Sequence, residues 1–301
     1  MKEDVKNSII CAFVADAISL GPHWIYDTRI IKNNFGTIEG ITNPLENSYH
    51  KGKTAGDFTH YGDQMEFLLE FISQYKKFDP EQFSIFWQDK MKNYNGYIDF
   101  ASKKTLQHLS NNGQWQYSGS NSDEFGGLAR MAPLLLAYDT EKELNEAIRL
   151  QTLLTHNSPL LLSIGNFLGK LILLVKENHS IADSVEQLKT VKTFKKIFQQ
   201  YIEPVKKGVD KTTSTEIKRF GQMCSAKNAF PSTMHLLLKF ETNPKEGILE
   251  NVMAGGDSAA RGIVFGTFMG LIHGIDWVPK EWLQTIKEMN RIEELIKEVP
   301  S

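Results

Sequence analysis

Apolar residues recur along most of this chain every three or four positions, which is the spacing of a buried helix face. In the first segment Ile9, Phe13 and Ala17 form such a stripe. No segment alternates apolar and polar positions with β-branched residues, so strands are not expected. The pattern predicts helices over residues 4–19, 64–74, 82–94, 99–110, 128–138, 141–155, 159–178, 182–191, 194–205, 214–221, 230–240, 258–274 and 279–299, with one more starting at Asn243.

Glycines and acidic residues mark the helix that organises the rest of the chain. Two glycines precede Asp257, which stands where a helix N-cap would stand. In the helix that follows, Gly262, Gly266 and Gly270 lie four positions apart, so they share one face and allow another helix to approach closely. Asp63 opens the helix 64–74 in a similar way.

Two polar segments, 34–61 and 113–127, contain turn residues but lack periodicity. Loops of this length inside a compact domain are usually functional. There is no linker of low complexity and no repeat of fixed period. We therefore predict an all-α fold in which residues 1–301 form a single compact multi-helix domain of roughly a dozen helices.

Composition narrows the classes of function. The 301 residues are 41% hydrophobic and 23% charged, as in soluble globular proteins. A net charge of −2 makes nucleic acid a poor partner, and two cysteines are too few for a disulfide framework. The apolar run 159–175 is interrupted by Lys170 and two other polar residues, so a buried helix is expected instead of a membrane span. The N-terminus lacks a secretory signal, which favours a cytoplasmic protein. Since neither nucleic acid nor a membrane is the expected partner, a small-molecule partner is favoured.

Polar chemistry gathers at helix ends in residues 16–27, 59–63, 118–130 and 255–257. Each place has a structural and a functional interpretation. Asp63 and Asp257 are N-caps or site carboxylates. The loop 118–127 is a solvated turn or a cradle of backbone N–H groups for a phosphate. Arg130 requires a protein carboxylate or an anionic ligand, and His156 either binds the last helix carbonyls or faces a ligand.

Several motifs, in this order, resemble the ADP-ribosylglycohydrolase family, whose members include proteins similar to dinitrogenase-reductase-activating glycohydrolase. They are CAFVADAISLGPHWIYD, FTHYGDQMEF, YNGYIDFASKKTL, FGGLARMAPLLL, LLTHNSP and AGGDSAARGIVFG. The resemblance covers nearly the whole chain. It implies an all-α fold and hydrolysis of an N- or O-glycosidic bond in an ADP-ribosyl or related ribosyl compound.

The resemblance also implies a changed metal site. The family binds two Mg²⁺ ions between two Asp-rich motifs, and of the four aspartates only Asp63 and Asp257 remain, since Gly62 and Ala259 replace the others. Two carboxylates balance one divalent cation, so we expect one Mg²⁺ or Mn²⁺ at most and not the usual pair. An alternative set adds His23, which stands where many members have Glu, and would suit Mn²⁺ or Fe²⁺.

Two functional interpretations remain open. In the first, a hydrolase uses Asp63 and Asp257 to position water or act as a base, and His23 to supply a proton near neutral pH. The substrate would bind to the loop 118–127 and to residues in three of the motifs, namely Ser118, Gly119, Ser120, Asn121, Gly126, Gly127, Arg130, His156, Tyr61 and Gln64.

In the second interpretation, the protein binds ADP-ribose or another nucleotide without turnover, or is a structural protein. The segments DAISLGPHWIYD, HYGDQ and GGDSAARG resemble the branch of the family that includes the J-type crystallins of jellyfish lens. Because fold does not fix function, only the polar character of His23, His60, Tyr61 and Gln64 favours the hydrolase.

Overall fold

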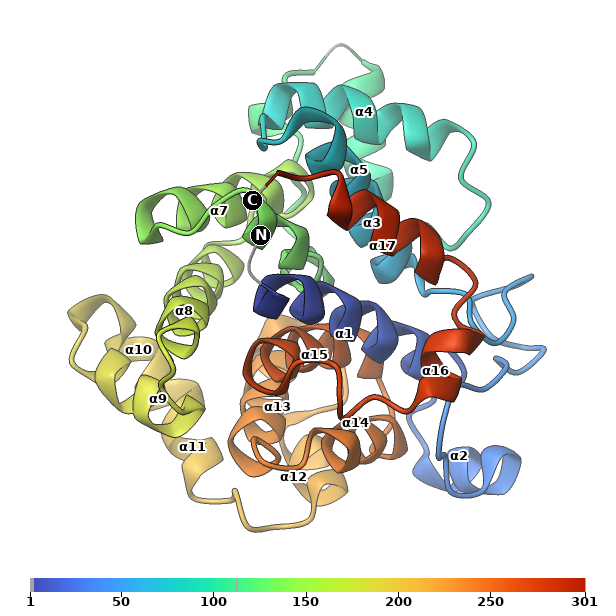
Figure 1. Cartoon of the computed structure of the whole chain (residues 1–301), viewed down its shortest axis with the longest axis vertical. Coiled ribbons are helices and arrows are strands. Elements are labelled where there is room, and N and C mark those ends of the chain that lie inside the picture. The colour runs from blue at the N-terminus through green and yellow to red at the C-terminus, as the bar shows by residue number, and fades with distance from the viewer. Residues whose placement is uncertain (1–2, 112, 301) are drawn as a thin grey trace.

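Two long helices lie side by side at the centre of the fold (Figure 1). The computed structural model describes residues 3–111 and 113–300, with α1 (Glu3–Leu20) and α15 (Ser258–His273) at its middle. A Cβ added at Gly266 would lie 2.4 Å from the backbone oxygen of Cys11. One at Gly270 would lie 2.5 Å from that of Asn7. The glycine stripe thus lets the two backbones approach closely, as its spacing predicted.

The remaining helices surround this pair. In chain order they are α2 (Thr28–Phe35), α3 (His60–Tyr75), α4 (Pro80–Lys92), α5 (Phe100–Ser110), η1 (Trp115–Tyr117), α6 (Gly126–Ala129), η2 (Ala132–Leu136), α7 (Glu141–Thr155), α8 (Pro159–Lys176), α9 (Ile181–Lys189), η3 (Lys192–Phe194), α10 (Lys195–Ile197), η4 (Phe198–Ile202), α11 (Glu203–Lys206), α12 (Thr213–Phe220), α13 (Ala226–Lys239), α14 (Pro244–Met253), α16 (Lys280–Thr285) and α17 (Met289–Lys297).

These helices form groups on different sides of α1 and α15 (Figure 1). One group contains α3, α4 and α5, with α17 packed on α3. Another contains α12, α13 and α14, and α8 to α11 form a third. Within the described residues the only strand-like pairings are isolated bridges, Ser120 with His156 and Glu124 with Ser225. The predicted all-α class is confirmed.

The segment 128–138 differs from the single helix that its sequence predicted. It divides into α6 (Gly126–Ala129) and the 3-10 helix η2 (Ala132–Leu136), with Arg130 and Met131 between them. Proline has no N–H and cannot continue an α-helical ladder, so Pro133 interrupts the hydrogen bonding here. Arg130 therefore sits at a break between helices, not in the middle of one.

Asp63 does not cap a helix, contrary to one interpretation of its position. Helix α3 begins earlier than predicted, at His60, and its N-cap is Thr59, whose hydroxyl accepts from the N–H of Tyr61 at 3.2 Å. Asp63 consequently lies in the first turn with its carboxylate free for other partners. Asp257 does cap α15, where its Oδ1 accepts from the N–H of Ala260 at 3.3 Å.

Other differences are smaller. Residues Thr28–Phe35, for which no helix was predicted, form α2, which Asp27 caps. Helix α13 begins at Ala226 and contains Pro231. The segment 194–205 includes the short π-helix η4 just before Pro204. Because proline has no N–H, it interrupts the regular α-helical hydrogen bonding here. The tail forms two helices, α16 and α17, where one was expected.

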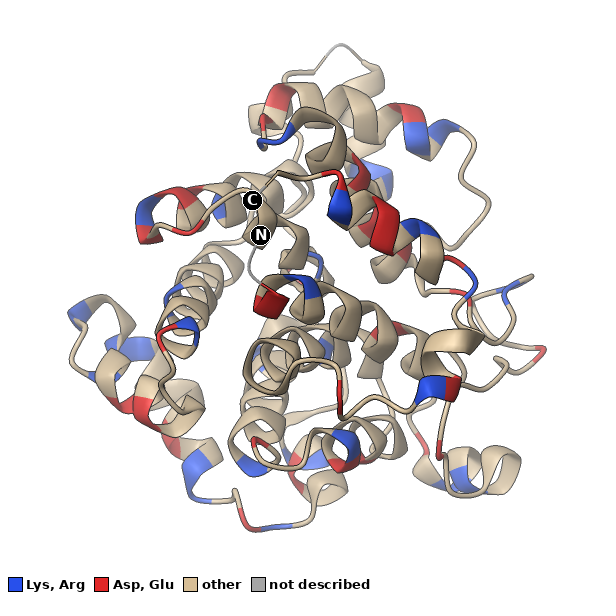
Figure 2. Ribbon diagram, viewed as in Figure 1, with Lys and Arg blue, Asp and Glu red and all other residues tan. Residues whose placement is uncertain are grey.

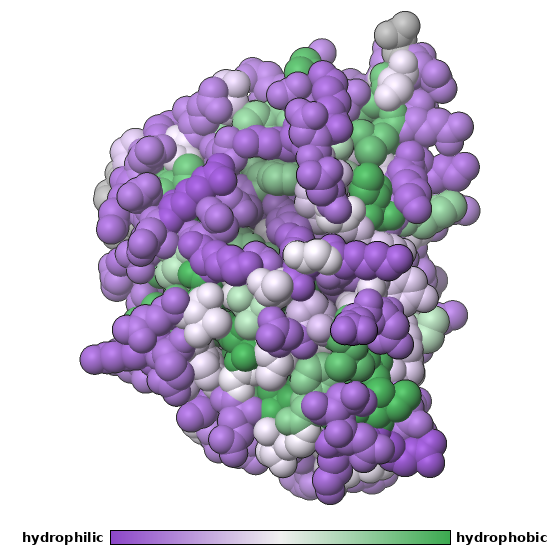
Figure 3. Space-filling model, turned by 90° about the vertical axis from the view of Figure 1, so that its right-hand side faces the viewer, coloured by the Kyte–Doolittle hydropathy of each residue, from purple (hydrophilic) through white to green (hydrophobic). Residues whose placement is uncertain are grey.

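The surface carries both signs of charge, interspersed over all groups of helices (Figure 2). The face with α16 is largely hydrophilic, with separate apolar areas between charged ridges (Figure 3). Helix α8 is long and apolar enough to span a bilayer by length and composition, but half of its residues are buried in the fold. It packs against α7, α9 and α15, as a core helix does.

Candidate active site

Asp257 and His23 form a fully buried pair at the start of α15. The His23 Nε2 lies 3.0 Å from Asp257 Oδ1, and neither side chain is exposed. Tyr61 donates its hydroxyl to the other carboxylate oxygen at 3.4 Å. The segment after α1 is held to the glycine turn by backbone bonds from Trp24 N to Gly256 O (2.9 Å) and back from Gly256 N to Ile25 O (2.8 Å).

Charge on this pair resides on the carboxylate. Burial would raise the pKa of Asp257, but the hydrogen bond from His23 and the charge of Arg261 help to hold it below its usual value. Burial lowers the pKa of His23, and Asp257 compensates only in part. His23 is thus neutral near pH 7, with its Nε2–H donated to Asp257. This shift does not favour the expected role of His23 as a proton donor near neutral pH, because burial disfavours the charged ring.

Further imidazoles extend this pair. His50, from the loop that precedes α3, places its Nε2 2.7 Å from His23 Nδ1. His60 lies beside both rings, 6.2 Å from His23 and 5.7 Å from His50 between centroids. Both ring nitrogens of His60 are buried and, among the described residues, have no hydrogen-bond partner. Burial lowers the pKa of His50 and of His60, so the cluster as a whole is uncharged at neutral pH.

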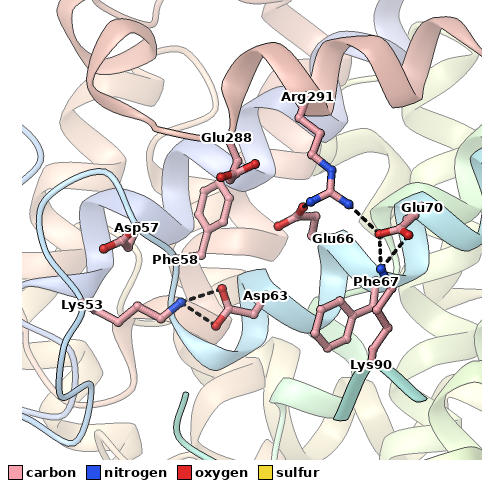
Figure 4. Close-up of a pocket in the computed structure, with 10 residues that line it drawn as sticks. All are labelled: Lys53, Asp57, Phe58, Asp63, Glu66, Phe67, Glu70, Lys90, Glu288 and Arg291. Atoms are coloured by element: carbon pink, nitrogen blue, oxygen red, sulfur yellow. Dashed lines mark hydrogen bonds and ion pairs between the residues drawn. The ribbon is translucent and has the colours of Figure 1, made fainter. Parts of the chain in front are cut away.

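Asp63 binds a different set of partners. Its two oxygens accept from the ammonium of Lys53 at 2.8 and 2.7 Å, as Figure 4 shows. The Tyr94 hydroxyl donates to Oδ2 at 2.5 Å. Burial raises the pKa of Asp63, while Lys53 and Tyr94 oppose that shift. Asp63 and Lys53 border a cavity of about 240 Å³, which is also lined by Arg291 of α17 and Glu66 of α3, paired at 3.0 Å.

The residues present do not fit a pair of Mg²⁺ ions. Asp257 binds His23 and Tyr61, Asp63 binds Lys53 and Tyr94, and these two sets have no side chain in common. Among the described residues, no group of three His, Cys, Asp or Glu side chains is arranged to hold a metal ion. The alternative ligand set of His23, Asp63 and Asp257 does not converge either. Mg²⁺ requires close to octahedral oxygen coordination, whereas here an ammonium group already occupies the oxygens of Asp63.

Gln64 and Arg130 belong to a buried network instead of an open surface. Arg130 donates to the side-chain oxygens of Gln64 and Thr155. The amide of Gln64 also accepts from Trp87 at 3.1 Å and lies 3.4 Å from Asp99 Oδ2. Arg130 is 5% exposed, and burial lowers its pKa to about 10. Its hydrogen-bond partners within the protein are therefore an amide and a hydroxyl, and not the carboxylate that was one of the two alternatives.

The network ends at His156, which lies beneath the loop 118–127. Thr155 Oγ1 lies 2.8 Å from His156 Nδ1, and the other ring nitrogen is buried with no partner among the described residues. A Cβ added at Gly127 would lie 2.7 Å from the His156 ring, and one at Gly126 would lie 2.1 Å from Tyr61. Both glycines are required by close packing of rings. Burial, and then Arg130, lower the pKa of His156 to about 4.

The first part of that loop is held by its own hydrogen bonds. Ser118 donates its hydroxyl to Leu154 O at 2.7 Å. The backbone of Ser120 makes two hydrogen bonds. Its N–H donates to Thr155 O at 2.9 Å, and its carbonyl accepts from the N–H of Asn157 at 2.7 Å. Gly119 packs against the backbone of Leu153, and Asn121 is exposed. The N–H of Ser120 is thus not available to a phosphate.

Glu124 is a site residue that the sequence did not single out. Its carboxyl accepts from Cys224 Sγ at 3.6 Å and lies 4.0 Å from His156 Nε2. Burial, followed by the charges of Asp99 and Asp257, raises the pKa of Glu124 to about 7. Two carboxyl groups of the same region therefore differ, because the pKa of Asp257 is lowered and that of Glu124 is raised to about 7.

Lys53 and His50 were also missed, for a related reason. Both lie in the unpatterned loop 34–61, where no periodicity indicates which side chains point inward. Tyr94 ends a predicted helix and gave no sign of its bond to Asp63. The length of the loop, typical of functional segments, was the one available signal.

Comparison with known proteins agrees with the all-α fold. The sequence profile of the family described as ADP-ribosylglycohydrolase matches residues 1–300. Crystallin J1A of Tripedalia cystophora is 19% identical, over 97% of this chain and 94% of its own. ADP-ribosylhydrolase ARH3 of Homo sapiens is 20% identical, over 74% of this chain and 68% of its own.

A solved structure titled ADP-ribosylglycohydrolase-related protein complex has the same fold. It superposes with a TM-score of 0.73 and 19% identity, covering 99% of this chain and 96% of that one. The fold and the site define an all-α glycohydrolase-type protein. This chain belongs to the ADP-ribosylglycohydrolase family.

Proposed function

We propose that this protein hydrolyses an N- or O-glycosidic bond of an ADP-ribosyl or related ribosyl compound without the family's usual pair of magnesium ions. The observation that carries the proposal is the contrast between two carboxyl groups. Asp257 has a lowered pKa, whereas that of Glu124 is raised to about 7. Groups whose environments separate their pKa values in this way are suited to opposite acid–base roles.

The roles follow from the protonation states. The ionised Asp257 takes a proton from the attacking water and stabilises positive charge that develops at the anomeric carbon. Glu124 gives its proton to the departing nitrogen or oxygen as the glycosidic bond breaks. The water oxygen forms the new bond to that carbon. His23 holds Asp257 in position through its Nε2–H and does not itself transfer a proton.

Arg130 acts at a distance from the ribosyl group in this scheme. It holds Thr155, which in turn is bonded to His156 beneath Gly127. The buried Nε2 of His156, unpaired among the described residues, remains as a hydrogen-bond partner for substrate. Asp63 is given no proton-transfer role, because both of its oxygens bind a cation, the ammonium of Lys53. On Asp257, His23 holds Oδ1, whereas Oδ2 has only the long 3.4 Å bond from Tyr61, which water would have to replace.

Turnover of an ADP-ribosyl-arginine or ADP-ribosyl-serine peptide tests the proposal, measured in EDTA and again with Mg²⁺. We expect activity in EDTA, with kcat reduced about 100-fold or more in Asp257→Asn and Glu124→Gln. Asp89→Asn is a matched control, because Asp89 is an exposed surface carboxyl paired with Lys92. The rate should fall above about pH 7 as Glu124 ionises, and Glu124→Gln should lose this decline. Activity that requires Mg²⁺, or that survives in Asp257→Asn, would refute the scheme.

One observation favours a second candidate function, a binding or structural protein without turnover. The ammonium of Lys53 covers both oxygens of Asp63, one of the two family aspartates that this chain retains. The similarity to crystallin J1A points the same way. Calorimetric binding of ADP-ribose with no release of product from either peptide would support this alternative. Turnover that is lost in Asp257→Asn would exclude it.

A further inference from the structure

A cavity of about 440 Å³ opens beside His23, on the surface between the end of α1 and the loop that follows α2. Its lining includes Trp24, Tyr26 and Tyr49 and the polar residues Asn47 and Ser48, and the buried ring of His23 lies behind Trp24. We refer to it as the aromatic pocket. None of the roles assigned above uses it.

Two rings of the aromatic pocket are exposed to solvent. Tyr49 is 65% exposed and Tyr26 is 41% exposed. Single exposed aromatic residues are ordinary, as with Tyr117 elsewhere on this surface. Here, however, two exposed rings border the same cavity as a partly buried tryptophan. Exposed apolar surface gathered in one concave place is typical of a binding site.

Trp24 is held in a strained conformation at the centre of this pocket. Its φ is +63°, in the left-handed region that a bulky side chain rarely adopts. The bond from its N–H to Gly256 O fixes that backbone, and its ring stacks on His23 with centroids 4.4 Å apart. Tyr49 packs edge-on against Trp24 at 5.4 Å. Such strain costs about 1–3 kcal/mol and is found mainly where surrounding contacts or function require it.

The lining indicates the chemistry of a ligand. Aromatic faces attract planar rings by stacking, which contributes about 1–3 kcal/mol per base in nucleic-acid complexes. Asn47 and Ser48 supply donors and acceptors for a polar ring edge. The one carboxylate of the lining, Asp27, is already paired with Arg29 at 2.7 Å, so a cationic ligand has no particular advantage.

We propose that the aromatic pocket binds an uncharged planar nitrogen heterocycle, of the nucleobase or nicotinamide type, stacked against Trp24 and Tyr49. Binding of the ring follows from the pocket alone. Its role as the leaving group of an N-ribosyl substrate rests on the proposed function, because His23 joins the pocket to Asp257.

Fluorescence titration of the full chain with nicotinamide and with adenine tests the proposal. We expect saturable binding at millimolar concentration or below, weakened about tenfold in Tyr49→Ala. Because Tyr49 is mostly exposed, this variant should fold normally. Trp24→Leu should remove most of the fluorescence change. Tyr117→Ala, which removes an exposed ring outside the pocket, should bind as wild type does.

The proposal is overturned if neither heterocycle binds the wild type, or if Tyr49→Ala binds both as tightly as wild type does. The proposed function fails separately. If heterocycles bind in the pocket but no ribosyl bond is hydrolysed, the binding proposal is supported and the proposed hydrolase function is refuted. If N-ribosyl heterocycles are hydrolysed with the same KM in Tyr49→Ala as in wild type, the hydrolase function is supported and the leaving-group role of the pocket is refuted.

Discussion

Replacing Lys53 with methionine tests whether an ammonium group neutralises Asp63 in this protein. The side chains are 22% and 12% exposed, and the Nζ to Oδ2 distance is 2.7 Å. At an effective dielectric constant of 20, two charges at that separation attract by about 6 kcal/mol. Desolvation of each ion costs several kcal/mol, so the intact pair contributes little net stability.

The cost of removing one partner is larger. Lys53→Met leaves the carboxylate of Asp63 desolvated and without its cation, which costs about 3–5 kcal/mol in a buried pair. We expect about 3 kcal/mol, because both groups keep some contact with water. Lys53→Met combined with Asp63→Asn should recover most of this loss, since no charge is then left behind.

The pH dependence has a definite sign. Burial already raises the pKa of Asp63, and Lys53 opposes that shift. Without Lys53 the pKa rises further. An acid whose pKa is raised by folding gives stability at low pH that is lost as pH rises through its folded pKa. The destabilisation in Lys53→Met should therefore be smaller at pH 5 than at pH 8.

Urea unfolding at the two pH values measures these effects. Lys92→Met is the control, because the Lys92–Asp89 pair is 70% and 78% exposed and its loss should change stability by less than about 0.5 kcal/mol. Millimolar Mg²⁺ should leave the melting temperature of the wild type unchanged. Equal destabilisation at both pH values, or no recovery in the double variant, would refute the reasoning.

Three further predictions concern the core and can be checked by urea unfolding. Gly266→Val should destabilise the fold by about 1–3 kcal/mol or prevent folding, since a Cβ there would lie 2.4 Å from Cys11 O; a variant as stable as wild type would contradict the close packing of α1 on α15. Asp16, which accepts from Thr59 at 2.7 and 2.6 Å, has its pKa raised to about 7 by burial. Wild-type stability should thus fall relative to Asp16→Asn between pH 5 and pH 8, and a constant difference would count against that shift. Burial, and then Lys239, lower the pKa of His235 to about 4, and both its ring nitrogens lack partners among the described residues. His235→Leu should be neutral or stabilising, with the larger gain below pH 6, where the wild type loses stability as the unfolded state takes up a proton.

The sequence by itself determined the helices and the position of one carboxylate. Helix faces, caps and close-packing glycines are encoded within a few residues, because they depend on local sterics and hydrogen bonds. The turn before α15 illustrates this, since the Gly255–Gly256–Asp257 pattern placed Asp257 at the N-cap, and the structure confirms it. The stripe through Gly266 likewise indicated a close helix neighbour, which is α1.

Only the tertiary structure decided which partners meet in the site. Whether Asp63 capped a helix or faced a ligand depended on Thr59, which takes the cap and leaves Asp63 for Lys53. Lys53 and His50 come from a loop without periodicity, so their directions are set by packing against distant helices and not by neighbours in sequence. Burial, which sets the pKa of Glu124, is likewise a property of the assembled fold.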